Sequence, residues 1–339
     1  MKEIAVVILN WNGEKLLKQF LPAIIKNTPP DLADIYIIDN ASTDNSVEYV
    51  KENFPTIKTI MLDKNYGFAG GYNLGLKQIQ AKYYAIINSD IEVTENWLNP
   101  LYNMLEHNTN IAMVQPKIKA YNNKEYFEYA GAAGGFLDKN YYPFCRGRIG
   151  DYTEKDEGQY DTAIEIFWAS GATSLIRSNV FWEIGGFDEH FFAHMEEIDL
   201  CWRIKSRGYK IYNEPSSVVY HIGGASLDKS SPKKTFLNFR NNILLIYKNK
   251  KNFFPFIIKR LILDTALAFL FLFKLKIRHF FAVTRAHCQS YIYMIKLRHA
   301  RKENMQKTKI WTFNEIYPGN ILWEAGIKKK EKFKDLNWK

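Results

Sequence analysis

The first ninety residues alternate between strand-like and helix-like patterns, and this alternation constrains the fold more than any other feature of the sequence. Apolar residues at helical spacing, most clearly between Leu16 and Ile25, separate short apolar runs. The runs interpreted as buried strands are 4–9, 35–38, 57–62 and 83–87. Four buried strands separated by helices predict an α/β domain with a mostly parallel sheet and helices on both faces.

Polar residues follow every one of these strands. They include Asn10, Asp39, Asn40, Asn65, Ser89 and Asp90. The carboxyl ends of parallel strands meet at one edge of a sheet, and ligands of open α/β sheets bind beyond that edge. Four polar strand ends in succession therefore predict a ligand site there.

The stretch NYGFAGGYNLGL after the third strand places four glycines beside Asn65 and Asn73. We expect a turn around Gly67 whose backbone approaches a ligand closely and points N–H groups at it, followed by a short helix near 74–79. A turn that only redirects the chain is the alternative, because the stretch is neither a P-loop nor a GxGxxG pattern.

Asp90 and His221 each end a strand pattern, in YYAIINSDIEV and VVYHIGG. Taken singly, an aspartate there is more often a turn residue and a histidine more often structural. Taken together, they would supply oxygen and nitrogen ligands to a hard cation, Mg²⁺ or Mn²⁺, that also binds phosphate oxygens. Both interpretations stay open.

Three carboxylates crowd the first turn of a helix predicted over 196–206, in HMEEIDLCWRIKSRGY. They are Glu196, Glu197 and Asp199. A structural interpretation is an acidic first turn favoured by the helix dipole, with an ion pair between Asp199 and Arg203. A functional one is a general base, since like charges raise the pKa of a neighbouring carboxyl.

The net charge of +10 comes from one segment. Between 248 and 302 there are thirteen Lys or Arg and one acid, Asp264, a net of +12, so the rest sums to about −2. Because this segment is aromatic and aliphatic, we expect an anionic membrane surface and no nucleic acid as its partner. Its run Phe253–Phe273 is interrupted by charges, so we expect a helix lying in the interface, with Lys and Arg toward the headgroups. A self-associating or partner-docking helix pair is the alternative.

Cys145, Cys201 and Cys288 are far apart and form no CxxC pair, which favours a reducing compartment over a zinc site or a disulfide framework. The apolar run at the start is too short for a signal peptide. We therefore expect a cytoplasmic protein, peripheral at the inner face of the cell membrane.

The motifs VVILNWNG, IDNASTDNS, NYGFAGGYNLG, INSD, SGATSLIR, IGGFDE, MEEIDLCWRIKSRGY and VVYHIGGAS occur in this order over roughly 4–245. In order and spacing they resemble the family 2 inverting glycosyltransferases, near the bacterial rhamnosyltransferase-like branch. The resemblance implies a GT-A fold and a metal-dependent hexosyltransferase. The sugar, with rhamnose as a candidate, would pass from a nucleotide diphosphate donor to a lipid-linked or polysaccharide acceptor in cell-surface glycan synthesis.

The resemblance also implies roles for individual residues. Donor contacts would be Asn10, Asp39, Asn40, Asn65, Gly67, Asn73, Ser89 and Arg240. Trp168, Ser170 and Gly171 would line the acceptor side, and Asp90 and His221 would hold the Mg²⁺ or Mn²⁺. The catalytic base would be Glu197 or its neighbour Glu196.

The sequence departs from the family pattern at three places. Asn88 stands where a full DxD motif has its first aspartate, so one metal ligand is missing. Glu197 stands where the family has an aspartate, which keeps Glu196 and Asp199 open as alternative bases. The absence of a QxxRW motif after the acidic helix argues against a processive synthase.

Three regions follow from these patterns. The catalytic domain is predicted over 1–225, with a donor half to about 115 and an acceptor half that includes an irregular loop or flap at 121–160. A basic aromatic helical segment follows at 226–303, then a tail at 304–339. The alternative functions are a nucleotidyltransferase, although VVILNWNG lacks the basic residue expected for one, and a non-catalytic protein that binds a nucleotide sugar or a membrane.

Overall fold

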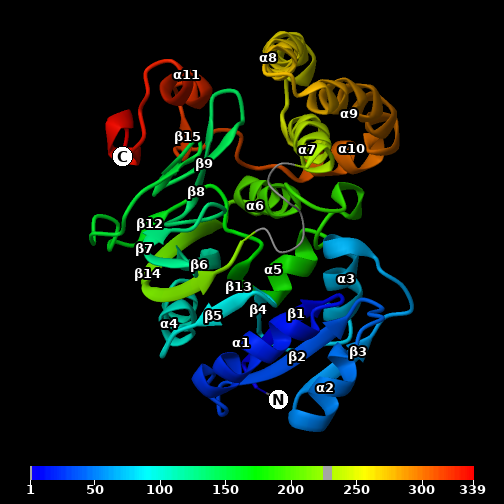
Figure 1. Ribbon diagram of the computed structural model, residues 1–339, viewed down its shortest axis with the longest axis vertical. Coiled ribbons are helices and arrows are strands. Elements are labelled where there is room, and N and C mark those ends of the chain that lie inside the picture. Colours follow the sequence, from blue (N-terminus) through cyan, green and yellow to red (C-terminus); the bar gives the residue numbers. More distant parts are fainter. Residues whose placement is uncertain (1, 224–230) are drawn as a thin grey trace.

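The computed structural model describes residues 2–223 and 231–339 (Figure 1). Its main sheet runs in the order β12-β14-β6-β13-β4-β1-β2-β3, with β5 paired to β14 and β7 to β6. The first four strands of the chain lie parallel and confirm the predicted α/β layout. They are β1 (Ile4–Asn10), β2 (Ala33–Asp39), β3 (Lys58–Met61) and β4 (Tyr83–Asn88).

The registers bring the polar strand ends together as predicted. Asn10 pairs with Asp39 at the end of β1 and β2, and Leu9 pairs with Asn88 on the other side of β1. The helices α1 (Glu14–Asn27) and α2 (Ser46–Asn53) connect these strands. The residues after β1, β2 and β4 therefore share one edge of the sheet.

Two local predictions in this half are wrong. The strand β3 is an edge strand whose Lys58 and Met61 are exposed, because no further strand covers it. The glycine-rich stretch is helical from its start, since α3 spans Gly67–Leu76. Its glycines let α3 approach the sheet: a Cβ built on Gly75 would lie 2.1 Å from Ile38 Cδ1.

The second half of the main sheet mixes strand directions. Strand β13 runs antiparallel between β4 and β6, and β14 runs parallel to β6. The helix α6 matches its predicted range of 196–206. The elements of this half are β5 (Ile91–Val93), α4 (Asn99–His107), β6 (Ile111–Ala120), β12 (Ile164–Glu165), β13 (Thr173–Arg177), α5 (Ser178–Glu183), η1 (Glu189–Phe191), α6 (Glu196–Ser206) and β14 (Lys210–His221).

The segment 121–160, predicted as a loop or flap, is instead built of short strands. They are β7 (Asn123–Phe127), β8 (Gly135–Asp138), β9 (Pro143–Cys145), β10 (Arg148–Ile149) and β11 (Tyr152–Thr153). The last four join β15 (Ile316–Tyr317) in a second sheet, β11-β10-β9-β8-β15. Phe136 and Phe144 pack there on Phe333 and Trp338 from the far end of the chain. These strands are only two to five residues long, too short to give a recognisable alternation of apolar and polar residues in the sequence.

Helices form most of the last third of the chain and lie above α6 in Figure 1. Helix α8 matches the predicted range 253–273 and packs on α9, and α7 packs on both α9 and α6. These elements are α7 (Pro232–Asn249), α8 (Phe253–Phe273), α9 (Ile277–Lys296), α10 (Arg298–Lys307), α11 (Ile321–Gly326) and η2 (Phe333–Leu336). Among the described helices, none has both the length and the apolar character needed to span a bilayer.

Two of the three predicted region boundaries fall inside an element of secondary structure. The boundary near 115 falls inside β6 and that at 303 inside α10, because each of these elements continues through the change in composition. The boundary at 225 lies outside the described residues. The division into regions stays a prediction.

Candidate active site

The predicted donor edge is the end of the sheet where Asn10, Asp39 and Asn40 lie, at the ends of β1 and β2. Asn10 links these two strand ends. Its Nδ2 donates to Asp39 Oδ1 (2.9 Å), Ser42 Oγ (3.1 Å) and Ser46 Oγ (2.8 Å). Asp39 also accepts from the Ser42 backbone N–H at 2.9 Å. Asn10 Oδ1 is buried without a hydrogen-bond partner among the described residues. The arrangement fixes the Asp39 carboxylate at the strand end and leaves it acceptor capacity.

Asn40 connects this edge to the start of α3. Its Nδ2 donates to Asn65 Oδ1 (3.1 Å) and to the Gly67 carbonyl (3.0 Å), and its Oδ1 accepts from the Tyr66 N–H (2.9 Å). Gly67 has a φ of +70°, which a larger residue adopts with strain. Asn40, Asn65 and Gly67 therefore lie together, as predicted, around the N-terminus of α3.

Two other predicted donor residues are engaged elsewhere. Asn73 Nδ2 donates to the Phe187 carbonyl at 2.9 Å and its Oδ1 accepts from the Phe187 N–H at 3.0 Å, so it binds the loop before η1. The Arg240 guanidinium donates to the carbonyls of Phe191 (3.0 Å) and His190 (3.3 Å). Both side chains therefore support the 186–191 loop, and direct donor contact by Asn73 and Arg240 stays a prediction.

Asp90 and His221, which are 131 positions apart, meet beyond the end of β4. His221 Nε2 lies 3.1 Å from Asp90 Oδ1, and both residues are buried. The strand β5, which follows Asp90, pairs antiparallel with the end of β14. Pairing of β5 with β14 therefore produces the predicted meeting of the two residues.

Glu128 is a third member of this cluster that sequence reasoning missed. Its Oε1 lies 3.5 Å from His221 Nδ1, and its Oε2 accepts from the Ala130 N–H. Burial opposes the charge of His221, but hydrogen bonds to Asp90 and Glu128 outweigh it and raise the pKa of His221 to about 10. No motif marked Glu128, which lies in the segment expected to be a loop.

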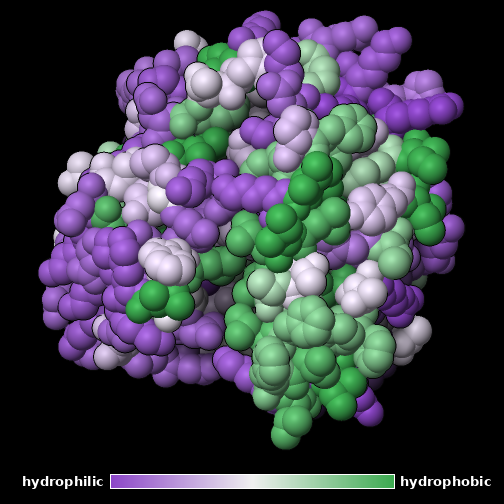
Figure 2. Space-filling model, turned by 90° about the horizontal axis from the view of Figure 1, so that it is seen from above, coloured by the Kyte–Doolittle hydropathy of each residue, from purple (hydrophilic) through white to green (hydrophobic). Residues whose placement is uncertain are grey.

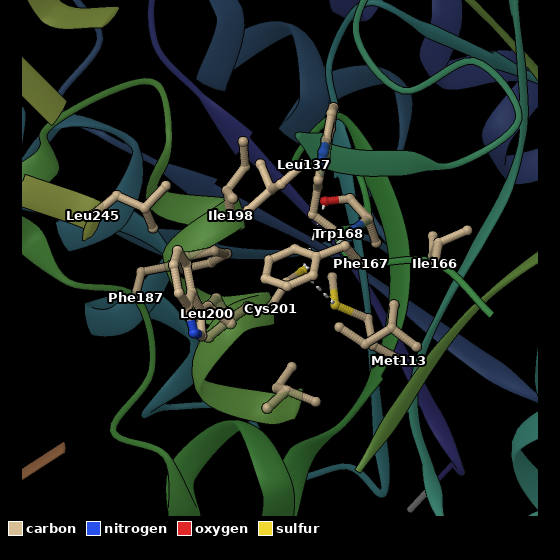
Figure 3. Packing of buried hydrophobic residues seen from close by; sticks show 14 of the residues in the cluster. Met113, Leu137, Ile166, Phe167, Trp168, Phe187, Ile198, Leu200, Cys201 and Leu245 are labelled. Atoms are coloured by element: carbon tan, nitrogen blue, oxygen red, sulfur yellow. Dashed lines mark hydrogen bonds between the residues drawn. The ribbon is translucent and has the colours of Figure 1, made fainter. Parts of the chain in front are cut away.

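The acidic helix α6 is anchored through an apolar face. Figure 3 shows Cys201 among Met113, Phe167 and Trp168, and its Sγ lies 3.8 Å from the Met113 Sδ. Ile198 belongs to the same buried cluster. This packing fixes the position of the helix and hence of its acidic first turn.

Burial dominates the electrostatics of that first turn. It raises the pKa of Glu197 to about 7, and it raises the pKa of Glu196 well above the usual value, with the neighbouring Glu197 charge adding to the effect. One carboxylate oxygen of each, Oε2, is buried without a partner among the described residues. Glu196 is 5% exposed, whereas Glu197 is partly exposed. Glu197 is thus the accessible carboxyl with a pKa near neutrality.

Asp199 is excluded as an alternative base because its oxygens are fully engaged. Oδ2 accepts from Arg203 Nε and Lys248 Nζ, both at 2.8 Å, and Oδ1 accepts from Asn249 Nδ2 at 2.8 Å. The expected Asp199–Arg203 pair is confirmed, and Asp199 is fully buried. Asp199 is therefore a structural carboxylate held in an ion pair, as the first of the two interpretations predicted. That interpretation does not extend to Glu197.

Of the predicted acceptor-side residues, only Gly171 is partly exposed. Trp168 is 4% exposed and its Nε1 donates to the Phe136 carbonyl at 3.0 Å. Ser170 is also buried, and its Oγ donates to the Ala130 carbonyl at 2.7 Å. The prediction that Trp168 and Ser170 line the acceptor side is corrected to support from beneath, since packing covers both.

The first turn of α6, with Glu196 and Glu197, is called the acid turn, and Asp90, His221 and Glu128 form the Asp90 cluster. Gly171 connects the two. A Cβ built on Gly171 would lie 3.5 Å from Glu197 Cβ. The next residue, Ala172, accepts at its carbonyl from the Asn88 N–H at 2.8 Å, two positions before Asp90. Glu197 and Asp90 therefore lie at the same end of β4, as is necessary if a base and a metal ligand are to act on one substrate.

The Asp90 cluster offers two ligand atoms for a cation, Asp90 Oδ1 and His221 Nε2, of which Nε2 would have to lose its proton when the cation binds. Neighbouring ligands of an octahedral Mg²⁺ lie about 2.0–2.1 Å from the ion and hence about 3 Å from each other. The observed 3.1 Å fits two such positions. Within the described residues, no group of three or more His, Cys, Asp and Glu side chains is arranged to hold a metal ion.

Comparisons with known proteins identify the family of this chain. The family model described as "Glycosyl transferase family 2" matches residues 5–185. The low-salt glycan biosynthesis hexosyltransferase Agl10 of Haloferax volcanii is 23% identical over 252 residues, 72% of this chain and 75% of that protein. The N-acetylglucosaminyl-diphospho-decaprenol L-rhamnosyltransferase of Mycobacterium tuberculosis is 21% identical over 232 residues, 64% of this chain and 75% of that protein.

A solved structure shows the same fold. GalNAc-T7 with UDP, GalNAc and Mn²⁺ superimposes with a TM-score of 0.60 at 20% identity, over 75% of this chain and 49% of that one. The present chain thus matches about half of the length of GalNAc-T7. The superposition confirms the predicted GT-A fold.

Proposed function

The chain belongs to glycosyl transferase family 2, and from this premise we propose that it moves a hexose from a nucleotide diphosphate donor to an acceptor hydroxyl with inversion, in cell-surface glycan synthesis. The observation that carries the proposal is Glu197: a partly exposed carboxyl with a pKa of about 7, at the same end of β4 as Asp90 and His221. The mycobacterial relative favours rhamnose as the sugar and a lipid-linked acceptor.

Glu197 is the proposed general base. A base acts best when its pKa lies near the working pH, because enough of it is ionised and it still takes a proton effectively. The residue is partly exposed, and its buried Oε2 has no hydrogen-bond partner among the described residues, so no protein group there competes with an acceptor hydroxyl for that oxygen. Glu196 is more deeply buried, and its burial together with the Glu197 charge raises its pKa well above the usual value, which disfavours ionisation of both adjacent glutamates at once.

Asp90 Oδ1 and His221 Nε2 are the proposed ligands of Mg²⁺ or Mn²⁺. Their 3.1 Å separation fits one ion, and the related GalNAc-T7 structure holds Mn²⁺ with UDP. When bound, such a cation neutralises the negative charge on a leaving diphosphate. The residues of the donor edge, Asp39 and Asn40 foremost, would orient the nucleotide, since their side chains are fixed at the strand ends beside this cluster.

The α8–α9 hairpin carries the proposed membrane contact. Eleven of its large apolar side chains are 46–85% exposed, and Figure 2 shows a continuous hydrophobic band on this face with hydrophilic surface beside it. The docking face is defined as Phe254, Ile258, Ile262, Phe269, Leu270, Phe273, Leu275, Ile277, Phe281, Ile292 and Ile295. Exposed apolar patches of this kind mark interaction sites.

The charges around the docking face favour an anionic membrane over a protein partner. Exposed cations on the same two helices and the turn between them are Lys259, Lys274, Lys276, Arg278, Arg285 and Lys296. Arg260, expected at the headgroups, is instead buried in an ion pair with Asp264 (2.8 Å), which also binds His287 at 3.0 Å. The contact between Asp264 on α8 and His287 on α9 joins the two helices on their buried side, and the apolar residues of the docking face lie on the outer side. We propose peripheral binding at the inner face of the cell membrane.

Turnover assays test the enzymatic proposal. Nucleotide sugars are screened with Mg²⁺ or Mn²⁺ for thermal stabilisation, and the best binder is assayed for transfer. Glu197→Gln and Asp90→Ala should each abolish most turnover, whereas the surface control Glu183→Gln should not. Full activity in both site variants, or nucleotide binding without turnover in the wild type, would reject the mechanism.

Vesicle flotation tests the membrane proposal. The full chain should float with vesicles that contain anionic lipid and much less with neutral ones, and added salt should weaken the binding. Ile258→Glu in the docking face should reduce flotation. Ile327→Glu is the matched control, because Ile327 is equally exposed, at 62%, and lies outside the face. Dimerisation through the face without any vesicle binding would contradict the proposal.

A further inference from the structure

The backbone immediately before the acid turn is strained. Three non-glycine residues there have positive φ: Phe192 (+64°), His194 (+68°) and Met195 (+74°). Bulky residues rarely adopt this region, and they do so mainly where the surrounding structure imposes it at functional sites. Met195 directly precedes Glu196, so its conformation sets the direction in which α6 begins.

One side chain donates hydrogen bonds to several carbonyls of this strained segment. Asn241 Nδ2, from α7, donates to the carbonyls of Phe191 (2.9 Å), Ala193 (2.9 Å) and His194 (2.7 Å). Asn241 is fully buried. Each acceptor carbonyl belongs to a residue next to, or within, the strained run.

Arg240 fixes the orientation of that amide. Its Nε donates to Asn241 Oδ1 at 2.8 Å, so the amide nitrogen must face the loop. Its Nη2 donates to the Phe191 carbonyl at 3.0 Å, one of the groups that Asn241 binds. The two adjacent side chains of α7 therefore act on the same few backbone groups.

We propose that Asn241 is a positioning residue that holds the 191–195 backbone in its left-handed conformation and thereby presents Glu197 to the acceptor. The proposal rests on the proposed function of Glu197 as the base. It assigns to α7 a part in catalysis that is separate from donor binding and from the docking face.

The first test separates kcat from donor binding. A displacement of about 1 Å at a reacting group costs about 100-fold in rate, so Asn241→Ala should lower kcat by about this factor. The KM for the donor should stay within about two-fold, because Asn241 touches no donor-edge residue. Asn242→Ala is the matched control: Asn242 is also buried on α7, but its Nδ2 donates to the Tyr141 carbonyl, away from the loop. An equal fall in kcat for both variants overturns the proposal.

The second test is a rescue. Glycine adopts φ near +74° without strain, so Met195→Gly added to Asn241→Ala should restore part of the lost kcat, about ten-fold. A residue that acted only through global stability would not be rescued by this change. No gain in the double variant relative to Asn241→Ala overturns the proposal.

Amide hydrogen exchange gives a reading that needs no substrate. Asn241→Ala should speed exchange at 191–197 by at least about ten-fold, while Asn242→Ala leaves these amides unchanged. Unchanged exchange there overturns the proposal whatever the activity. Failure of the proposed function would look different: the wild type would turn over no donor, although exchange still responded to Asn241→Ala.

Discussion

The donor edge and the acid turn are held in place in different ways. At the donor edge, Asn10 and Asp39 lie at the ends of neighbouring parallel strands and bond to each other and to nearby residues. At the acid turn, the residues before Glu196 depend on Asn241, and Asp199 depends on Lys248 and Asn249, all from α7. Changes at the first region should therefore alter donor binding, and changes at the second should alter turnover.

The largest effect that would test this contrast is at the acid turn itself. Glu197→Gln removes the proposed base and should lower kcat about 1,000-fold, within the range for loss of general base catalysis. The thermal shift produced by the donor should remain, because the donor edge is intact. Loss of donor binding together with activity would show that the two regions are not separable.

A smaller effect is expected where α7 supports α6. Lys248 Nζ bonds to Asp199 (2.8 Å) and Asp188 (2.5 Å), and all three residues are buried or nearly so. Lys248→Met leaves these carboxylates without one cation and should lower the free energy of unfolding by about 3 kcal/mol. Urea denaturation measures this. Lys251→Met, at an exposed position beyond α7, should change it by less than about 0.5 kcal/mol.

The donor edge should respond with a more modest loss of stability and a distinct kinetic signature. Asn10→Ala removes three hydrogen bonds and should lower the free energy of unfolding by about 1–3 kcal/mol. The KM for the donor should rise more than kcat falls. Asn53→Ala, which loses one exposed bond to the Tyr49 carbonyl, is the control. A pure kcat effect for Asn10→Ala would contradict the assignment of this edge to the donor.

The smallest effect is a pH dependence confined to the acid turn. Burial raises the pKa of Glu197 to about 7, so kcat/KM should rise with pH up to about 7 as the carboxylate forms. Between the unfolded pKa of 4.5 and about 7 the folded protein binds more protons, so this group makes stability fall as pH rises. Denaturation across that window, compared with Glu197→Gln, measures the slope. If the pH dependence of kcat/KM and of the free energy of unfolding is the same in Glu197→Gln as in the wild type, another group titrates.

The sequence predicted those parts of the site whose elements carry a local pattern. The apolar runs, the polar residues after them and the spacing in HMEEIDLCWRIKSRGY gave the strands of the donor edge and the range of α6. The strand-end positions of Asp90 and His221 suggested them as partners, the resemblance supported this, and the structure places them 3.1 Å apart. Periodicity did not predict that the helix in the glycine-rich stretch begins at Gly67, because glycine has a low helix propensity. Close packing of α3 on the sheet outweighs that low propensity.

Contacts between distant parts of the chain explain what could not be predicted. Glu128 lies in a segment without a recognisable period, and only the folded chain brings it to His221. Trp168 and Asn73 are residue types suited to ligand contact. In the folded chain, however, Trp168 Nε1 donates to the Phe136 carbonyl and Asn73 Nδ2 donates to the Phe187 carbonyl. A side chain's neighbours, rather than its type, decide whether it remains available to a ligand.

By itself, the sequence determined the α/β architecture, the edge of the sheet that carries the site and the basic apolar character of the α8–α9 hairpin, because these depend on periods and runs within short segments. Tertiary structure alone decided that Glu197 and not Asp199 is the available carboxyl, and that Asn241 supports the backbone before it. The reason is physical: pKa and backbone strain depend on burial and on partners that lie about 40–50 positions away in the chain.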